Sequence, residues 1–258
     1  MRNKFSVSRG CCAAGACYVV TARAVEKYPH GRGFTEDDIS WIHIPDYYPR
    51  PNLLGGVVRN GFFWVWQRRT FHTPDGFLYR GGAQCTKLNL DSGSVEGESI
   101  VYDLPFMDVN HKKALIAGVT NDNSLIVWES LGTNVVFKVD FDDTEITDWR
   151  FDIPNDLADP KGEDSFLIEN TVVGKDDTVY IQYRTGGKGP SGSPGYTMPA
   201  WSFITALSAN KGEELWTFAQ PLSIMKRFVL DSSSQIWTCI DYVAVSYTHL
   251  TLPTIYSV

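Results

Sequence analysis

The sequence predicts an all-β fold, a partial β-propeller of four-stranded antiparallel blades with about three complete blades and a fragment of a fourth. Three observations predict it: a composition rich in aromatic and β-branched residues, a hairpin pattern that recurs four times, and further strand-like segments after these hairpins. Aromatic residues make up 13% of the 258 residues, hydrophobic residues 43% and charged residues 21%. This is the composition of a folded globular chain.

The recurring hairpin consists of an apolar residue, a short polar turn and a second apolar strand. Six positions separate the leading apolar residue from an apolar residue beyond the turn in every copy. The leading and following residues are Val57 and Phe63, Val119 and Leu125, Val173 and Val179, and Leu230 and Ile236. The turns contain residue types that tolerate tight hairpins. They are Asn60-Gly61, Asp122-Asn123, Asp176-Asp177 and Asp231-Ser232.

The spacing of the copies predicts the size of the repeating unit. Successive hairpins begin 62, 54 and 57 residues apart, which is enough for a four-stranded blade. Two more strand-like segments follow each of the first three hairpins, namely 86–90 with 99–104, 135–141 with 149–153, and 202–207 with 214–218. A four-stranded sheet cannot cover both of its faces alone, so we expect the sheets to stack as in a propeller. A β-sandwich is the alternative, but it does not require a shared signature at the third strand of every unit.

That signature is clearest in the third unit, where residues 206–216 read ALSANKGEELW. It resembles the tryptophan-docking repeat of the pyrroloquinoline-quinone-like (PQQ-like) propeller family, in which Ala, Asp, Thr-Gly and a Trp ten residues after the Ala recur. Ala206, Gly212 and Trp216 match this repeat, whereas Ser and Lys replace the usual Asp and Thr. A glycine at the turn supplies a positive φ, and a Trp leaving the turn can lie flat between blades and bury about 150 to 250 Å².

The other units carry looser copies of the signature, and the resemblance extends over residues 55 to about 243. In the second unit Val139, Thr144 and Trp149 fall at the corresponding spacing. In the first unit Asp91-Ser92-Gly93 keeps the turn, and we interpret the following residues as an insertion that displaces the Trp. The predicted blade-docking residues, all with a structural role, are Ala206, Gly212, Trp216, Thr144, Trp149 and Gly93.

Three segments are predicted along the chain. Residues 1–54 precede the repeats, and a helical turn after Thr35 and a strand over 41–44 are expected in them. Residues 55–244 form the partial propeller, with 185–200 as a loop. Residues 245–258 carry no charge and resemble the translated adapter tail of truncated gene models, with a terminal strand as the alternative.

The first 24 residues bear on localisation. Basic residues are followed by a short apolar run and a small-residue site, a weak match to a signal peptide that would direct the protein to the periplasm or the cell exterior. An ordinary strand fits the same residues. Since no apolar stretch approaches the roughly 20 residues needed to cross a bilayer, we expect no integral membrane segment. The net charge of −7 offers no basic surface for phosphates, so nucleic acid is not an expected partner.

The sequence assigns no catalytic residue. Hydrolase elbows, zinc-protease motifs, calcium loops and phosphate loops are missing from the sequence. The five cysteines match neither a disulfide framework nor a zinc site, so free or buried thiols are expected. They are Cys11, Cys12, Cys17, Cys85 and Cys239. No cofactor-binding or metal-binding residue is predicted.

The favoured interpretation is a non-catalytic propeller that binds a protein, peptide or glycan, similar to the propeller lipoproteins of bacterial outer-membrane assembly. The resemblance also implies an alternative, a truncated PQQ-dependent quinoprotein oxidoreductase whose site for PQQ and calcium lies outside this fragment. Related alcohol dehydrogenases stack a vicinal disulfide on the cofactor, and Cys11-Cys12 is a vicinal pair. However, the Asn-Arg-Gly that normally follows is missing, and a fold analogy does not carry a site with it.

Overall fold

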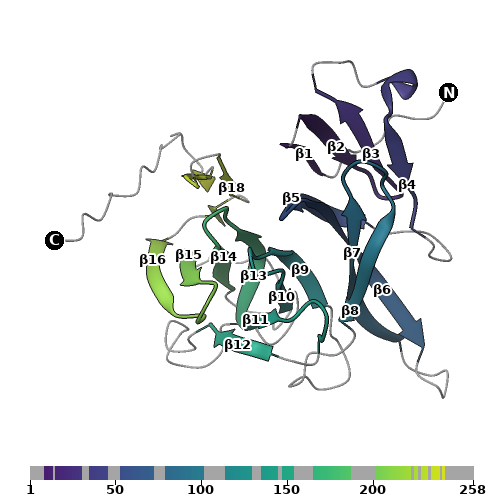
Figure 1. Ribbon diagram of the computed structural model, residues 1–258. Coiled ribbons are helices and arrows are strands. Elements are labelled where there is room, and N and C mark those ends of the chain that lie inside the picture. Colours follow the sequence, from purple (N-terminus) through teal and green to yellow (C-terminus); the bar gives the residue numbers. More distant parts are fainter. Residues whose placement is uncertain are drawn as a thin grey trace. The chain divides into compact units, whose positions relative to one another are not determined.

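The computed structural model shows an almost entirely β-stranded chain (Figure 1). The residues that it describes are 9–13, 15–30, 35–45, 53–72, 79–101, 114–129, 135–144, 147–153, 165–186, 201–221, 224–225, 228–231, 234–238 and 240–241. In these ranges no helix has the length and apolar character to cross a membrane. The chain divides into two compact units, residues 1–129 with 138–148 and residues 130–137 with 149–258.

Four sheets share one design, in which four strands pair in chain order. The first sheet holds β1 (Arg9–Ala13), β2 (Ala16–Val20), β3 (Val25–Pro29) and β4 (Trp41–His43). The second holds β5 (Leu53–Arg59), β6 (Phe62–His72), β7 (Tyr79–Asn89) and β8 (Val95–Val101). The third holds β9 (Ala114–Val119), β10 (Leu125–Glu129), β11 (Val135–Val139) and β12 (Thr147–Asp152). The fourth holds β13 (Ser165–Val173), β14 (Thr178–Gly186), β15 (Trp201–Ser208) and β16 (Glu214–Pro221).

The chain ends its described part in two short pairings. Strand β17 (Ile224–Met225) pairs with β20 (Ile240–Asp241), and β18 (Val229–Leu230) pairs with β19 (Ile236–Trp237). We call β18 and β19 the last hairpin. The predicted all-β fold of four-stranded antiparallel blades with a fragment at the end is therefore confirmed. The predicted tail 245–258 and most of the predicted 185–200 loop lie outside the described residues.

The first sheet was not expected as a blade. Its residues belong to the segment 1–54 that the sequence analysis placed before the repeats, although the 3₁₀ turn Glu36–Asp38 and strand β4 match the expectation there. Residues 9–13 and 16–20 are strands, and Tyr18 and Val20 are 1% exposed. The possible signal peptide over residues 1–24 stays a prediction. The sequence did not indicate the hairpin of β1 and β2, because small residues replace the usual aromatic and β-branched ones around its turn.

Two cysteines can be compared with the expectation of free or buried thiols. Cys17 on β2 is disulfide-bonded, so the expectation is wrong for this residue. Cys85 on β7 is free and fully buried, and burial raises the pKa of its thiol well above the ordinary range. A buried neutral thiol of this kind behaves as a small apolar side chain.

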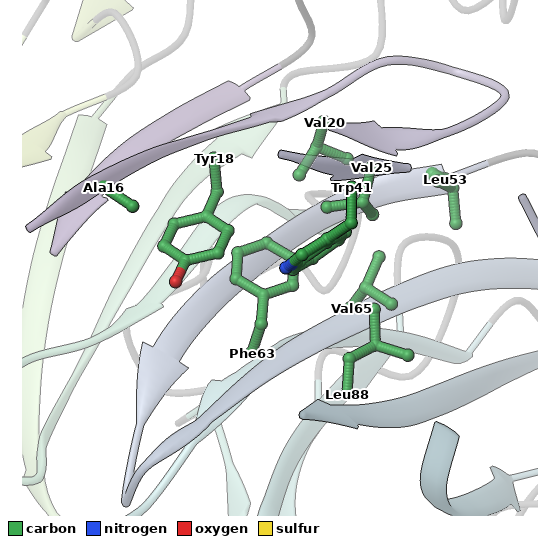
Figure 2. Packing of buried hydrophobic residues seen from close by; sticks show 9 residues of the cluster. All are labelled: Ala16, Tyr18, Val20, Val25, Trp41, Leu53, Phe63, Val65 and Leu88. Carbon is green, nitrogen blue, oxygen red and sulfur yellow. The ribbon is translucent and has the colours of Figure 1, made fainter. Parts of the chain in front are cut away.

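A core forms where the first and second sheets face each other (Figure 2). Tyr18 stacks on Phe63 with ring centroids 4.8 Å apart, and Trp41 lies 5.9 Å from Tyr18 at a tilted angle. The cluster consists of Ala16, Tyr18, Val20, Val25 and Trp41 from the first sheet and Leu53, Phe63, Val65 and Leu88 from the second. These residues alternate along their strands, as expected of one buried sheet face.

The hairpins agree with the predicted repeat. The residues beyond the turns are all buried, and Phe63, Leu125 and Val179 are 0% exposed. Phe63 pairs with Val58 across its hairpin, whereas Leu125, Val179 and Ile236 pair with the leading apolar residue of their copies. The first of the predicted hairpins has a two-residue Asn60-Gly61 turn with both φ angles positive, typical of type I′. The others use a longer turn, whose positive-φ residues are Asn123, Asp177 and Ser234.

Candidate functional site

Trp149 of β12 docks onto the turn between β15 and β16. Its Nε1–H donates to the carbonyl oxygen of Ala209 at 2.6 Å. Gly212 in the same turn has a φ of +67°, and a Cβ built there would lie 2.6 Å from Cδ2 of Trp149. The glycine therefore both permits the turn and leaves room for the indole. The predicted docking role of Trp149 and Gly212 matches this geometry.

A second docked tryptophan, Trp41, was missed by the sequence analysis. Its Nε1–H donates to the carbonyl oxygen of Leu90 at 3.0 Å, and its ring lies against Gly93, whose φ is +71°. Gly93 was predicted as a docking residue, and the indole that lies against it belongs to Trp41 of the preceding sheet. The sequence contains a signal for this contact, because in both cases a Trp precedes the glycine of a later turn. The separation is 52 residues for Trp41 and Gly93 and 63 residues for Trp149 and Gly212.

Ala206 and Trp216 are direct partners between β15 and β16. Ala206 is fully buried, whereas Trp216 is half-buried with its ring 6.1 Å from that of Tyr180. Both belong to the cluster around Met225 and Phe228, which joins the fourth sheet to the last hairpin. Trp216 therefore packs toward the segment that follows, as a docking Trp should, but without the hydrogen bond that Trp149 makes.

The second sheet lacks a docking Trp, and the predicted insertion is wrong. Strand β8 follows the Gly93 turn directly, and Gly97 pairs with Lys87 as Trp216 pairs with Ala206. The ring of Phe141 lies near Gly97, since a Cβ built there would be 3.5 Å from the ring. Ser99 Oγ donates to the carbonyl oxygen of Phe141, in the role that an indole N–H has elsewhere.

Thr144, the last predicted docking residue, lies in the turn between β11 and β12. Its Oγ1 donates to the carbonyl oxygen of Ile100 at 3.0 Å. The nearby Phe141 ring meets the edge of Trp64 at 4.9 Å. Thr144 therefore holds the third sheet to β8 through its hydroxyl group.

An ion cluster occupies the turn end of the third sheet. Lys138 is 4% exposed, and its Nζ lies 2.5 Å from Asp122 Oδ2 and 3.1 Å from Asp148 Oδ2. Burial opposes the charge of the Asp122 carboxyl, but hydrogen bonds from Lys138, Thr120 and the Ser124 N–H outweigh it and lower the pKa to about 2. Burial likewise opposes the charge of Lys138, but its two carboxylate partners raise its pKa. Both groups are held in their charged forms.

Asn60 ties this turn to the preceding hairpin. Its Nδ2 donates to the carbonyl oxygen of Asn121 at 2.9 Å and to Oδ1 of Asn123 at 2.7 Å. Arg59 adds a bond of 3.0 Å from Nη1 to Oδ1 of Asn121. These side chains link two neighbouring turns by hydrogen bonds, which is a structural role.

A different polar group lies on β6 and β7. Gln67 and Gln84, 2% and 1% exposed, face each other across the strands, and Gln67 Nε2 donates to Gln84 Oε1 at 2.7 Å. Arg69 Nε donates to the same oxygen at 2.5 Å. Among the described side chains, Gln67 Oε1 is one of four buried polar atoms without a hydrogen-bond partner. We call Gln67, Gln84 and Arg69 the glutamine–arginine group.

The fold does not require polar residues at this place. The equivalent cross-strand pair in the fourth sheet is Tyr183 and Phe203, whose rings stack 5.0 Å apart. A buried acceptor without a partner costs about 1 to 3 kcal/mol. The glutamine–arginine group therefore lowers stability relative to an apolar pair at this place. It is the candidate site for ligand recognition. The sequence did not indicate this group, because a single Gln in a strand forms no recognisable pattern with its neighbours.

In the part of the chain that the structure describes, no three His, Cys, Asp or Glu side chains are grouped to hold a metal ion. Cys11-Cys12 lies on β1, paired with β2, and the structure describes only its backbone.

Comparison with known proteins yields only remote similarity. The chain matches no protein-family model, and no curated protein matches it. MPT-1, a GDP-Man-dependent mannosyltransferase from Leishmania mexicana, is 10% identical with a TM-score of 0.40 over 87% of this chain and 76% of that chain. The N-terminal domain of Nup159 is 10% identical with a TM-score of 0.38 over 90% of this chain and 56% of that chain. At these scores the similarity carries no argument about function.

Proposed function

We propose that this protein is a non-catalytic binding or scaffold protein built of tryptophan-docked blades. The docking of Trp41 and Trp149 supports the proposal, because such packing is what the resemblance to PQQ-like propellers implies. The proposed ligand is a protein, a peptide or a glycan. It is recognised by the glutamine–arginine group.

The electrostatics support a role without acid–base chemistry. A general acid or base works best with a pKa near the operating pH. The shifted pKa values in the described residues lie away from neutral pH. The pKa of Asp122 falls to about 2, and the pKa of Lys138 rises. Burial and the hydrogen bond to Glu26 raise the pKa of Tyr28 to about 12. These groups keep one charge state at neutral pH, as structural groups do.

The observation that carries the binding role is the buried oxygen of Gln67. This acceptor requires an N–H or O–H donor, while the half-buried Arg69 guanidinium carries a positive charge. Peptide groups and sugars present both hydrogen-bond donors and acceptors. A ligand of either class carries a donor for the buried oxygen, which it reaches only if β6 and β7 open locally, and acceptors for the positive charge of Arg69.

The test is a binding screen of the full chain against arrays of short peptides and of glycans, followed by titration of the best ligand. Arg69→Met and Gln67→Met are each expected to raise the dissociation constant about tenfold, since one charge-assisted hydrogen bond contributes about 1.5 to 3 kcal/mol. Arg184→Met is the matched control, because Arg184 forms an ion pair with Glu169 in a different sheet. It should leave the dissociation constant unchanged.

Two outcomes would contradict the proposal. If no peptide or glycan binds, or if Arg184→Met weakens binding as much as Arg69→Met, the glutamine–arginine group is not the site. If the chain gains red absorption and alcohol oxidation after reconstitution with PQQ and calcium, the oxidoreductase is the better explanation and the non-catalytic role fails.

A further inference from the structure

Arg68 on β6 is a half-buried arginine whose charge is not matched within the described structure. Its Nε is one of the four buried polar atoms without a hydrogen-bond partner among the described side chains. No ion pair of Arg68 is found in the part of the chain that the structure describes. Because a guanidinium stays charged at any ordinary pH, a buried N–H of this group without an acceptor lowers stability. The position is therefore suited to an anion.

The fourth sheet carries an arginine at the equivalent position. Arg68 follows Phe63, the buried residue beyond its hairpin turn, by five positions. Arg184 on β14 likewise follows Val179 by five positions. The same point of the blade thus holds an arginine in both sheets, and the two can be compared directly.

In the fourth sheet a carboxylate of the same sheet neutralises this arginine. Nε of Arg184 lies 2.8 Å from Oε1 of Glu169, and the two side chains are 20% and 21% exposed. Glu169 is the extra residue of a β-bulge in β13, because the register passes from Ile168 to Asn170. A bulge redirects a side chain out of the regular alternation of a strand, and here it brings the carboxylate to the arginine.

The second sheet has the same bulge without the carboxylate. The register of β5 passes from Leu53 to Gly55, so Leu54 is the extra residue. In both sheets the residue after the bulge pairs with the residue two positions before the arginine. Leu54 therefore occupies the place of Glu169, and its apolar side chain cannot pair with the charge of Arg68.

We propose that Arg68, beside the β5 bulge, binds a carboxylate from outside the chain, which takes the place that Glu169 has in the fourth sheet. A carboxylate matches the fork of N–H groups that a guanidinium presents. The cross-strand partner of Arg68 is the small Ala83, which adds no bulk beside the guanidinium. Because the long side chain is only half-buried, its rotation brings Nε to the ligand without separating the strands.

This site is separate from the glutamine–arginine group. Arg68 and Arg69 are consecutive residues of β6, so their side chains point to opposite faces of the sheet. The inference does not depend on the proposed function. The carboxylate belongs to an acidic side chain of a peptide or to a small free acid, and the test includes a probe for each.

An NMR titration of the isotope-labelled full chain tests the proposal. The Nε–H signal of Arg68 is identified by its loss in Arg68→Met. It should shift on addition of a blocked Gly-Gly-Glu-Gly-Gly peptide and on addition of acetate, and the probe that binds more tightly identifies the source of the carboxylate. The same peptide with Gln in place of Glu should leave the signal unchanged. The Nε–H signal of Arg184 is the internal control, since Glu169 already binds it.

Leu54→Glu is the decisive variant, because it supplies a carboxylate at the place of Glu169. It should raise the dissociation constant of the glutamate peptide at least about tenfold, since a carboxylate of the same chain has a high effective concentration. Leu54→Gln is the matched control and should bind the peptide like the wild type. Circular dichroism of each variant shows that the strands are retained.

Three results overturn the proposal. The first is an Arg68 signal that moves with neither the glutamate peptide nor acetate. The second is an equal movement with the glutamine peptide, which would show that the charge of the ligand is not recognised. The third is undiminished binding of the glutamate peptide to a folded Leu54→Glu variant.

Discussion

The indole ring of Trp41 lies against Gly93, 52 residues further along the chain. A Cβ built on Gly93 would lie 2.7 Å from two ring atoms, and the φ of this residue is +71°. Trp149 and Gly212 repeat the arrangement in a different pair of sheets. The docking of a tryptophan on a positive-φ glycine is therefore the repeated contact between consecutive sheets.

Gly93→Ala should destabilise the protein by about 3 kcal/mol, because the methyl group adds an overpacking cost to the backbone strain of a positive φ. Gly61→Ala is the matched control, since Gly61 has a φ of +79° with no atom within 4 Å of the added Cβ. It should cost only about 1 kcal/mol from strain. Urea unfolding followed by tryptophan fluorescence measures both. Equal losses would show that the indole of Trp41 is not packed on Gly93.

Trp149→Phe should lower the free energy of unfolding by about 1 to 3 kcal/mol, because the buried carbonyl of Ala209 loses its donor. Trp216→Phe is the control in the same unit, as this indole is half-buried and packs on Tyr180 without such a bond. Its loss should be clearly smaller. The measurement is denaturant unfolding with the m-value checked for each variant. A Trp216→Phe loss as large as that of Trp149→Phe would refute the role of the hydrogen bond.

Stability should depend on pH through Asp122. Its folded-state pKa of about 2 lies below the ordinary 3.8, so its contribution is present above about pH 4 and is lost as the pH falls toward 2. Because Asp122 is 53% exposed, we expect this contribution to be about 1 kcal/mol or less. The stability difference between wild type and Asp122→Asn should therefore shrink as the pH falls from about 6 to 2. A difference that stays the same between pH 6 and pH 2 would contradict this role of Asp122.

Gly97→Ala should stabilise the protein by about 0.4 to 1 kcal/mol, because it reduces the conformational freedom of the unfolded chain. The added methyl would lie 3.5 Å from the Phe141 ring, which is an ordinary contact, and the backbone there is an extended strand. Thermal unfolding measures the gain. Gly56→Ala is the opposite control, since its Cβ would lie 2.6 Å from the Phe63 ring. A destabilising Gly97→Ala would mean that Phe141 lies closer to β8 than described.

The sequence was most informative where a structure is local. The four hairpins appear at their predicted places, and the turn residues Asn60, Asn123 and Asp177 take positive φ angles. Hairpin chemistry depends on neighbouring residues, so a short window contains all the information. The same window did not indicate that Phe63 pairs with Val58 and not with Val57, because the type I′ turn is shorter than the turns of the other copies.

The candidate site could not be predicted in this way. Gln67 and Gln84 meet only because β6 and β7 pair in a particular register, and the missing partner of Gln67 Oε1 depends on everything packed around it. The spacing of the residues also could not indicate the disulfide of Cys17 or the burial of Lys138 between two carboxylates. Such properties belong to packed neighbours, not to positions along the chain.

The amino-acid sequence by itself determined the class of fold, because alternating apolar residues and repeated turns specify strands and hairpins through short-range interactions. It also indicated Trp149 and Gly212 as docking residues. Only the tertiary structure decided that Trp41 docks as well, that Gly97 and Ser99 replace a tryptophan in the second sheet, and that residues 9–43 form a blade. The physical reason is that docking joins residues 52 and 63 positions apart, and such contacts depend on how sheets pack face to face.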